Sequence, residues 1–96
     1  MNSDLFENLL HLLKKSNYSN EQIMHRIQVT IGSAGSVSTS QLNKLMSFFS
    51  SDFDKLELAK MAYGYVSDRN SYHHIINKPF ASNQTKTLLS QFINRQ

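Results

Sequence analysis

Acidic side chains gather around one lysine in the stretch Asp52–Glu57, which reads DFDKLE. Alternating oxygen ligands of this kind open the loop of an EF-hand, which also needs glycine at its sixth position and glutamate at its twelfth. Counted from Asp52, those positions hold Glu57 and Tyr63, so the stretch does not form a calcium loop. Acidic residues also favour the first turn of a helix, because the positive end of the helix dipole stabilises them. The stretch therefore predicts the start of a helix.

The four histidines lack the spacing with which helices bind metals. His73 and His74 are adjacent, and adjacent helical side chains diverge by about 100°, so the pair does not converge on one ion. The sequence has no His-x-x-x-His motif, no Gly-x-Ser-x-Gly nucleophile elbow and no cysteine. We therefore predict a non-enzymatic protein with no catalytic residues, no metal site and no cofactor.

Lysine and tyrosine side chains are the remaining candidates for binding. Lys55 and Lys86 recur at equivalent positions of a repeat described below, where they bind an anion or cover the core with their methylene stems. Tyr65 lies on a different side of its expected helix from Tyr63, and an exposed tyrosine is a common anchor at interfaces. The candidate partner-binding residues are Lys55, Lys60, Tyr65 and Lys86.

Apolar residues recur at helical spacing along the chain, and no segment alternates strictly between apolar and polar residues. This pattern predicts an all-α protein with about six short helices. The segment GSAGSVS, residues 32–38, predicts a flexible connection and lacks the Lys-Ser/Thr sequel of a phosphate-binding loop. Helix starts are expected at residues that favour caps: Asp4, Ser19, Ser38, Ser51, Asp68, and Ser82 or Asn83.

Length and charge limit the classes of protein to which the chain can belong. Its 96 residues predict a single domain, residues 1–96. The net charge is +3, and the Lys and Arg residues are scattered, whereas nucleic-acid-binding domains usually gather them. Acidic residues precede the first apolar run and lysines follow it, the reverse of a secretory signal, and no run reaches the ~18 apolar residues of a membrane span. We expect a cytoplasmic protein, or a domain of a longer one, without a membrane span.

A repeat with a period of 31 residues relates Tyr18, Phe49 and Phe80. Each aromatic follows one short helical pattern and precedes a second, onto which it can fold as a hydrophobic staple. One such hairpin cannot bury its own apolar face, so the pattern predicts three stacked helical hairpins, as a compact bundle or a short solenoid. Residues of N-cap type stand two positions after the aromatics: Asn20, Ser51 and Ser82.

Much of the chain resembles a known family. The patterns Phe-x-x-Leu-Leu-x-x-Leu, Thr/Ser-x-x-Gln-x-x-x-Leu, FSSDFDKLELAKMAYGYVSDRNSYHHI and FASNQTKTLLSQFI are similar to a small helical domain described only as a domain of unknown function, family 4476. The resemblance spans roughly residues 6–93, and the segment 32–38 departs from it, since a shorter linker is expected there. It implies a helical domain that is often joined to other segments, and it implies no activity.

These observations favour an interaction or scaffolding module that binds a protein or peptide partner. The alternative is a binder of nucleic acid or anionic lipid, which would use Lys and Arg residues if they converge on one face. Binding that weakens steeply with salt would support the alternative. Self-association into a homo-oligomer stays open, because the ends of stacked helical arrays can pair.

Overall fold

The computed structural model describes residues 1–72, 76 and 80–94. This part of the chain is all-α, which confirms the predicted class, and it contains an isolated parallel β-bridge but no strand. Two 3-10 turns follow α4: η1 (Tyr63–Tyr65) and η2 (Arg69–Ser71). The α-helices are α1 (Ser3–Lys15), α2 (Asn20–Ala34), α3 (Thr39–Met46), α4 (Asp52–Ala62) and α6 (Asn83–Asn94).

The described part therefore contains five α-helices instead of the predicted six. The remaining expected helix, between Asp68 and Pro79, falls partly on residues outside the described ones, as do His73 and His74. Within that span η2 is a 3-10 turn, and Tyr72 and Ile76 are helical.

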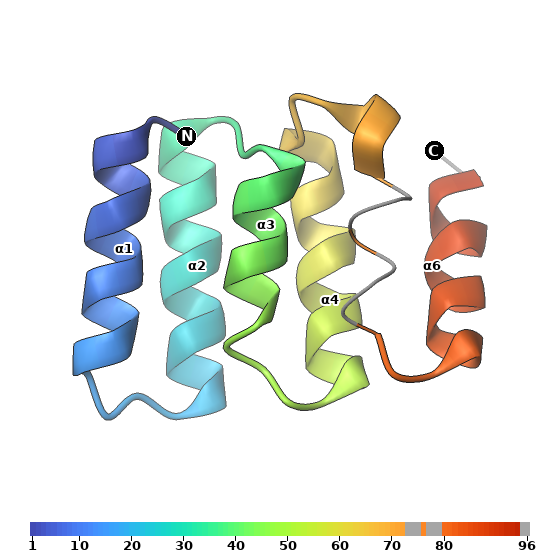
Figure 1. Cartoon of the computed structure of the whole chain (residues 1–96), viewed down its shortest axis with the longest axis horizontal. Coiled ribbons are helices and arrows are strands. Elements are labelled where there is room, and N and C mark those ends of the chain that lie inside the picture. The colour runs from blue at the N-terminus through green and yellow to red at the C-terminus, as the bar shows by residue number, and fades with distance from the viewer. Residues whose placement is uncertain (73–75, 77–79, 95–96) are drawn as a thin grey trace.

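The helices lie side by side from α1 to α6 (Figure 1). Helices α1 to α4 run in alternating directions, and α6 runs in the same direction as α4 (Figure 1). α4 packs directly against α2, α3 and α6, while α1 packs against α2. The helix at the centre of the fold is therefore the one that begins with the acidic stretch.

Side chains at the predicted starts cap four of the described helices, and at α6 the Ser82 Oγ accepts from the Gln84 N–H. Ser19 and Gln22 form a capping box at α2, in which the Ser19 Oγ accepts from the Gln22 N–H and the Gln22 Oε1 accepts from the Ser19 N–H. Ser38 forms the same box at α3, and the Ser51 Oγ accepts from the N–H groups that open α4. Asn2, rather than Asp4, caps α1. These caps satisfy N–H groups that have no partner within the helix.

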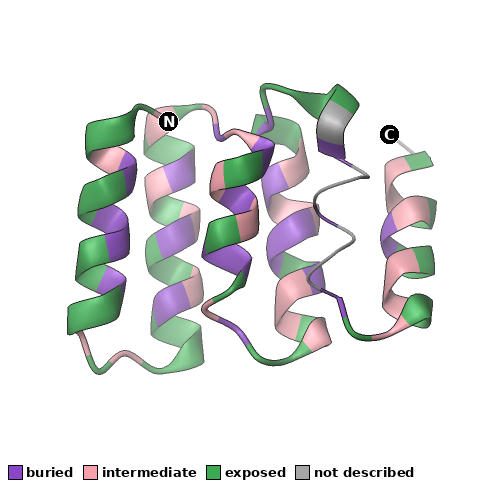
Figure 2. Ribbon diagram, viewed as in Figure 1, coloured by how far each residue is buried: buried purple, intermediate pink, exposed green. Residues whose placement is uncertain are grey.

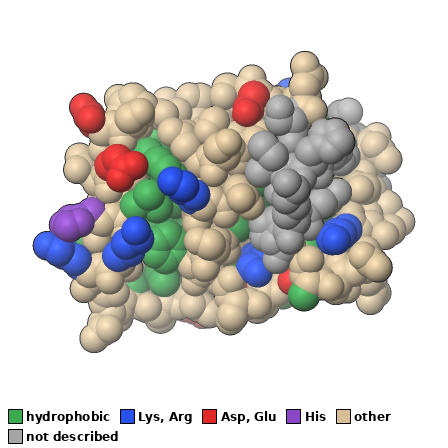
Figure 3. Space-filling view, viewed as in Figure 1, with side chains coloured by type: hydrophobic (Ala, Val, Ile, Leu, Met, Phe, Trp, Pro, Cys, Tyr) green, Lys and Arg blue, Asp and Glu red, His purple; other side chains and the backbone are tan. Residues whose placement is uncertain are grey.

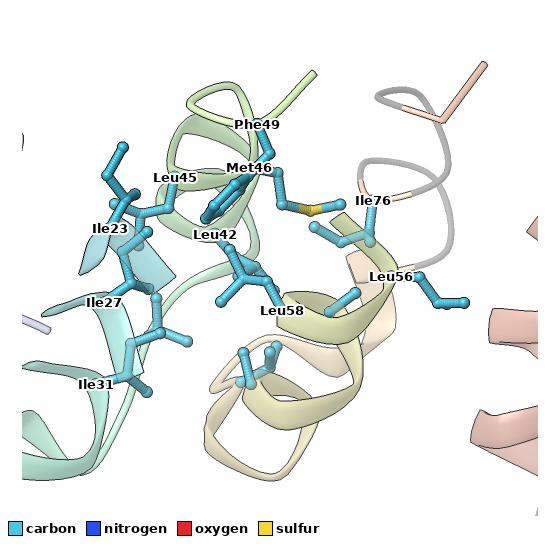
Figure 4. Close-up of a cluster of buried hydrophobic side chains, with 14 of the residues drawn as sticks. Ile23, Ile27, Ile31, Leu42, Leu45, Met46, Phe49, Leu56, Leu58 and Ile76 are labelled. Atoms are coloured by element: carbon cyan, nitrogen blue, oxygen red, sulfur yellow. The ribbon is translucent and has the colours of Figure 1, made fainter. Parts of the chain in front are cut away.

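The core runs along the inner sides of all five α-helices (Figure 2). In the close-up of Figure 4, Ile23, Ile27 and Ile31 of α2 extend toward α3, from which Leu42 and Leu45 point back. Two of the three aromatics of the 31-residue pattern are buried, Phe49 and Phe80, whereas Tyr18 is only half-buried. The Arg26 guanidinium instead lies over the Tyr18 ring, 5.8 Å from the centre of the ring.

The connection between α2 and α3 is shorter than the sequence suggests. Residues 32–34 form the last turn of α2, and Gly35 ends the helix with a left-handed backbone at φ 79°. Val37 is fully buried and forms the β-bridge with Val66, since the Val37 N–H donates to the Tyr65 carbonyl and the Ser67 N–H donates to the Val37 carbonyl. This bridge joins the α2–α3 turn to the segment after η1.

Asp68 acts on a different helix from the one expected. The sequence predicts that it caps the helix that follows, yet its side chain makes no cap hydrogen bond there. Its Oδ1 instead accepts from the N–H and the hydroxyl of Thr39, both at 2.7 Å. Because Thr39 is the first residue of α3 and is fully buried, Asp68 supplies a second cap to α3 from a distant part of the chain.

Candidate functional site

The four residues singled out for binding occupy different parts of the fold. Lys55 is in the first turn of α4 and Lys60 is in its last turn, which separates them by about 7.5 Å along the helix axis. Tyr65 lies in η1, beyond the end of α4, and Lys86 lies on α6. Tyr65 is 39% exposed. Only Lys55 and Lys60 share a helix, and none of the four residues lines either of the two grooves described below.

Aromatic rings and cations fill the space between the end of α4 and α6. The Tyr63 ring meets the Phe92 ring edge to face, with centres 6.4 Å apart. The Lys60 ammonium lies 5.8 Å from the centre of the Phe92 ring, and the Arg69 guanidinium lies 5.1 Å from the centre of the Tyr63 ring. These cation–π contacts occupy rings that a ligand would otherwise use. We interpret the cluster as an intramolecular joint between α4 and α6.

The buried side chain of Tyr72 also packs at this joint. The Tyr72 hydroxyl donates to the Ala59 carbonyl at 2.8 Å, and the Tyr72 ring meets the Tyr63 ring edge to face at 5.1 Å. Burial raises the pKa of the Tyr72 phenol well above its usual range, and the neighbouring Tyr63 raises it further. The phenol is therefore held neutral while it donates this hydrogen bond inside the core.

The acidic stretch of α4 holds the start of α6. The Asp52 carboxylate accepts from the Ala81 N–H at 3.0 Å and from the Ser82 N–H at 2.8 Å. These two bonds hold the pKa of the Asp52 carboxyl below its usual range, and smaller contributions come from Thr85 and Lys55. The Asp52 oxygens therefore bind the backbone that leads into the next helix.

A groove lies on the outer side of α2 and has a volume of about 430 Å³. Its apolar surface comes from the half-buried ring of Tyr18 and from Val29, which is 51% exposed. Because Val29 and the buried Ile27 lie on opposite sides of α2, the helix presents an apolar residue to solvent on its polar face. The lining residues are Tyr18, Glu21, Gln22, His25, Arg26 and Val29.

A second groove lies between α2 and α4 and has a volume of about 340 Å³. Glu21 and His25 line both grooves, so the two adjoin along α2. We call the pair the α2 surface. Met24 is half-buried and gives the second groove apolar area, and no Lys or Arg lines it. Its lining residues are Asn20, Glu21, Met24, His25, Gln28, Asp54 and Glu57.

Metal binding finds no support in this geometry. In the described ranges, no three His, Asp or Glu side chains are arranged so that they could hold one ion. None of the helices described there is long and apolar enough to cross a lipid bilayer. The α2 surface combines polar and apolar side chains.

Comparison with models of known protein families matches residues 1–93 to the family described as Domain of unknown function (DUF4476). The chain belongs to this family. The match confirms the resemblance noted in the sequence, and it covers the whole of the α2 surface of this DUF4476 domain. No curated protein and no solved structure matches the chain. Any function of the α2 surface must therefore be argued from its own residues.

The α2 surface was missed in the sequence because no single motif joins its residues. Two signals were present in the stretch Ser19–Ile31: an apolar Val29 on the polar side of the helix, and Met24 at the position where the other two repeats carry Lys55 and Lys86. The absence of that lysine leaves the second groove without a cation of its own.

Proposed function

We propose that this DUF4476 domain is a non-enzymatic interaction module that binds a protein or peptide along the α2 surface. The observation that carries the proposal is the pair of adjoining grooves, which meet at Glu21 and His25 and leave Val29 exposed. Grooves with mixed linings beside a rigid helix suit the docking of a peptide helix, a common mode of peptide recognition. The aromatic cluster at α6 is less suited, because Lys60 and Arg69 already lie over its rings.

We further propose that the chain is built as three helical hairpins whose second helices are α2, α4 and α6. The packing of α4 against both α2 and α6 supports this arrangement, since it sets the three second helices in one row. The two long-range carboxylate contacts also fit a period near 31 residues, because each joins residues 29 or 30 positions apart. A row of parallel helices offers grooves between neighbours, and the second groove of the α2 surface lies between two of them.

The alternative of nucleic-acid or anionic-lipid binding has less support. Lys and Arg side chains are separated from one another on the face shown in Figure 3, where they lie over α1 and α2 and again nearer α4 and α6. A strip of hydrophobic side chains over α1 and α2 occupies the same face (Figure 3). Binding to a phosphate backbone normally requires a continuous basic stripe.

Affinity capture with the intact domain tests the proposal. We expect a protein partner to be retained at physiological salt by the wild type, and to be lost when Val29→Glu places a charge in the first groove. Leu88→Glu is the matched control, because Leu88 is an exposed leucine on α6 with 45% exposure. Loss of the partner with Tyr65→Ala but not with Val29→Glu would move the binding site to η1. If RNA or anionic vesicles are retained and no protein is, the interaction module is the wrong function.

A further inference from the structure

We infer that the groove between α2 and α4 receives a cationic amphipathic helical segment of a partner protein. This inference rests on the proposed function and names the chemistry of the partner. It follows from three properties of the groove: the sign of its charge, the length of the surface that continues from it, and the apolar area that it contains.

The charge of the groove is opposite to that of the chain. Glu21, Asp54 and Glu57 line it without any Lys or Arg, although the chain carries a net charge of +3. Glu21 is in the first turn of α2 and Asp54 is in the first turn of α4. The positive ends of these two helix dipoles offset about one unit of charge in total. About two negative charges therefore remain to attract a cationic side chain.

The length of the α2 surface sets the length of the segment. Its residues on α2 run from Asn20 to Val29, which is about 14 Å along the helix and matches about ten residues of a partner helix. Met24 provides an apolar contact about midway along this path, and Val29 provides one at its end. A partner helix with apolar residues on one side and Lys or Arg beside them would match both the apolar contacts and the carboxylates.

The same charges argue against a second copy of this chain as the occupant. Two copies at +3 each repel one another at long range, whereas a partner segment can concentrate its positive charge at the groove. Sedimentation of the free domain separates these cases. A self-association that Glu57→Lys abolishes would identify a second copy as the occupant and would overturn the inference.

A synthetic peptide of Leu and Lys at amphipathic helical spacing tests the charge preference directly. It should be about 18 residues long, because isolated helices shorter than about 15 residues are marginal in water. The controls are a scrambled peptide of the same composition and a peptide with each Lys replaced by Glu. Binding to the full chain is followed by amide chemical shifts and by titration, and we expect the shifts to concentrate at Asn20–Gln28 and Asp54–Glu57.

A charge reversal at the rim gives the decisive comparison. We expect Glu57→Lys to weaken binding of the Leu-Lys peptide about fivefold or more. Glu7→Lys on α1 makes the same change at another exposed helical glutamate, and it should weaken binding less than about twofold. Circular dichroism verifies that both variants fold. Equal losses in the two variants, or equal binding of the scrambled peptide, would overturn the inference, because general attraction would then explain the binding.

The failure of this inference differs from the failure of the proposed function. If the Glu peptide shifts the same amides as strongly as the Lys peptide, the groove binds peptides without the inferred charge preference, and only the inference fails. If no peptide shifts the residues of the α2 surface and Val29→Glu also retains every captured protein, the proposed function fails as well.

Discussion

Replacing Asp68 with alanine should lower the free energy of unfolding by about 2 kcal/mol. The change removes the carboxylate that accepts from the N–H and the hydroxyl of Thr39, both at 2.7 Å. Thr39 is fully buried at the start of α3, so water cannot readily replace the lost acceptor. The Ser38–Gln41 capping box stays in place, so α3 should lose stability without losing its position.

The magnitude follows from what the variant leaves behind. A hydrogen bond to a charged acceptor contributes about 1.5 to 3 kcal/mol, and two such bonds would give about 4. The Thr39 hydroxyl keeps a second acceptor, the Asp68 carbonyl at 3.2 Å, so one of the two bonds is partly replaced. The exposure of Asp68 to solvent weakens the electrostatic part of the remainder. These two corrections bring the expected loss to about 2 kcal/mol.

Urea unfolding followed by circular dichroism measures this loss, and its pH dependence identifies the carboxylate as the cause. Hydrogen bonds from Thr39 hold the pKa of Asp68 below its ordinary value of 3.8. A group whose folded pKa is lowered stabilises the fold above its unfolded pKa and loses that contribution as the pH falls through the folded value. The difference between wild type and Asp68→Ala should therefore be constant above about pH 5 and shrink below pH 4.

Two control variants make the reasoning refutable. Asp68→Asn keeps an oxygen acceptor without the charge, so it should lose less free energy of unfolding than Asp68→Ala. Its stability should also lack the pH dependence that the Asp68 carboxylate contributes to the wild type. Glu7→Ala changes an exposed carboxylate on α1 and should stay within about 0.5 kcal/mol of the wild type. If Asp68→Ala costs no more than Glu7→Ala, the carboxylate does not hold α3, and the reasoning is refuted.

Three further predictions concern the ends of the helices and the α4–α6 joint. Asp52→Ala should speed hydrogen exchange at the first amides of α6 more than at those of α2, because its carboxylate accepts from the backbone leading into α6; unchanged exchange would contradict this role. Gly35→Ala should destabilise the fold by about 1 kcal/mol because Gly35 has φ 79°. Gly32→Ala lies inside α2 and should stabilise the fold by about 0.5–1 kcal/mol. Thermal or urea unfolding would measure both changes. Tyr72→Phe should cost about 1 kcal/mol at pH 7 through its bond to Ala59. The wild type should lose stability relative to Tyr72→Phe above about pH 10, because the pKa of Tyr72 is raised in the fold; parallel alkaline unfolding of the two proteins would be evidence against this.

The elements that could be predicted from the sequence are the ones whose signals are local. The capping boxes at Ser19 and Ser38 are short patterns that depend on residues three apart, and both form as predicted. Local chemistry was sufficient in these cases because each interaction closes within one turn of helix.

The long-range contacts could not be predicted in the same way. Asp68 has the residue type and position of an N-cap, and only the arrangement in space turns it toward Thr39. The α2 surface depends on which side of α2 is left uncovered by α1 and α4, and a helical pattern alone does not decide that when Val29 lies among polar residues. Tyr65 is exposed, but it lies in η1 and not on the helix from whose phase its exposure was predicted.

The central position of α4 determines how the chain can be divided. Its contacts extend to α2, α3 and α6, and Asp52 and Asp68 tie the segments at its two ends to α6 and α3. A cut in the loop before Ser51 would give two fragments, each lacking the surface that completes its core. Neither fragment should fold alone, and an equimolar mixture should recover the helical signal by complementation. The domain should therefore unfold in one cooperative transition.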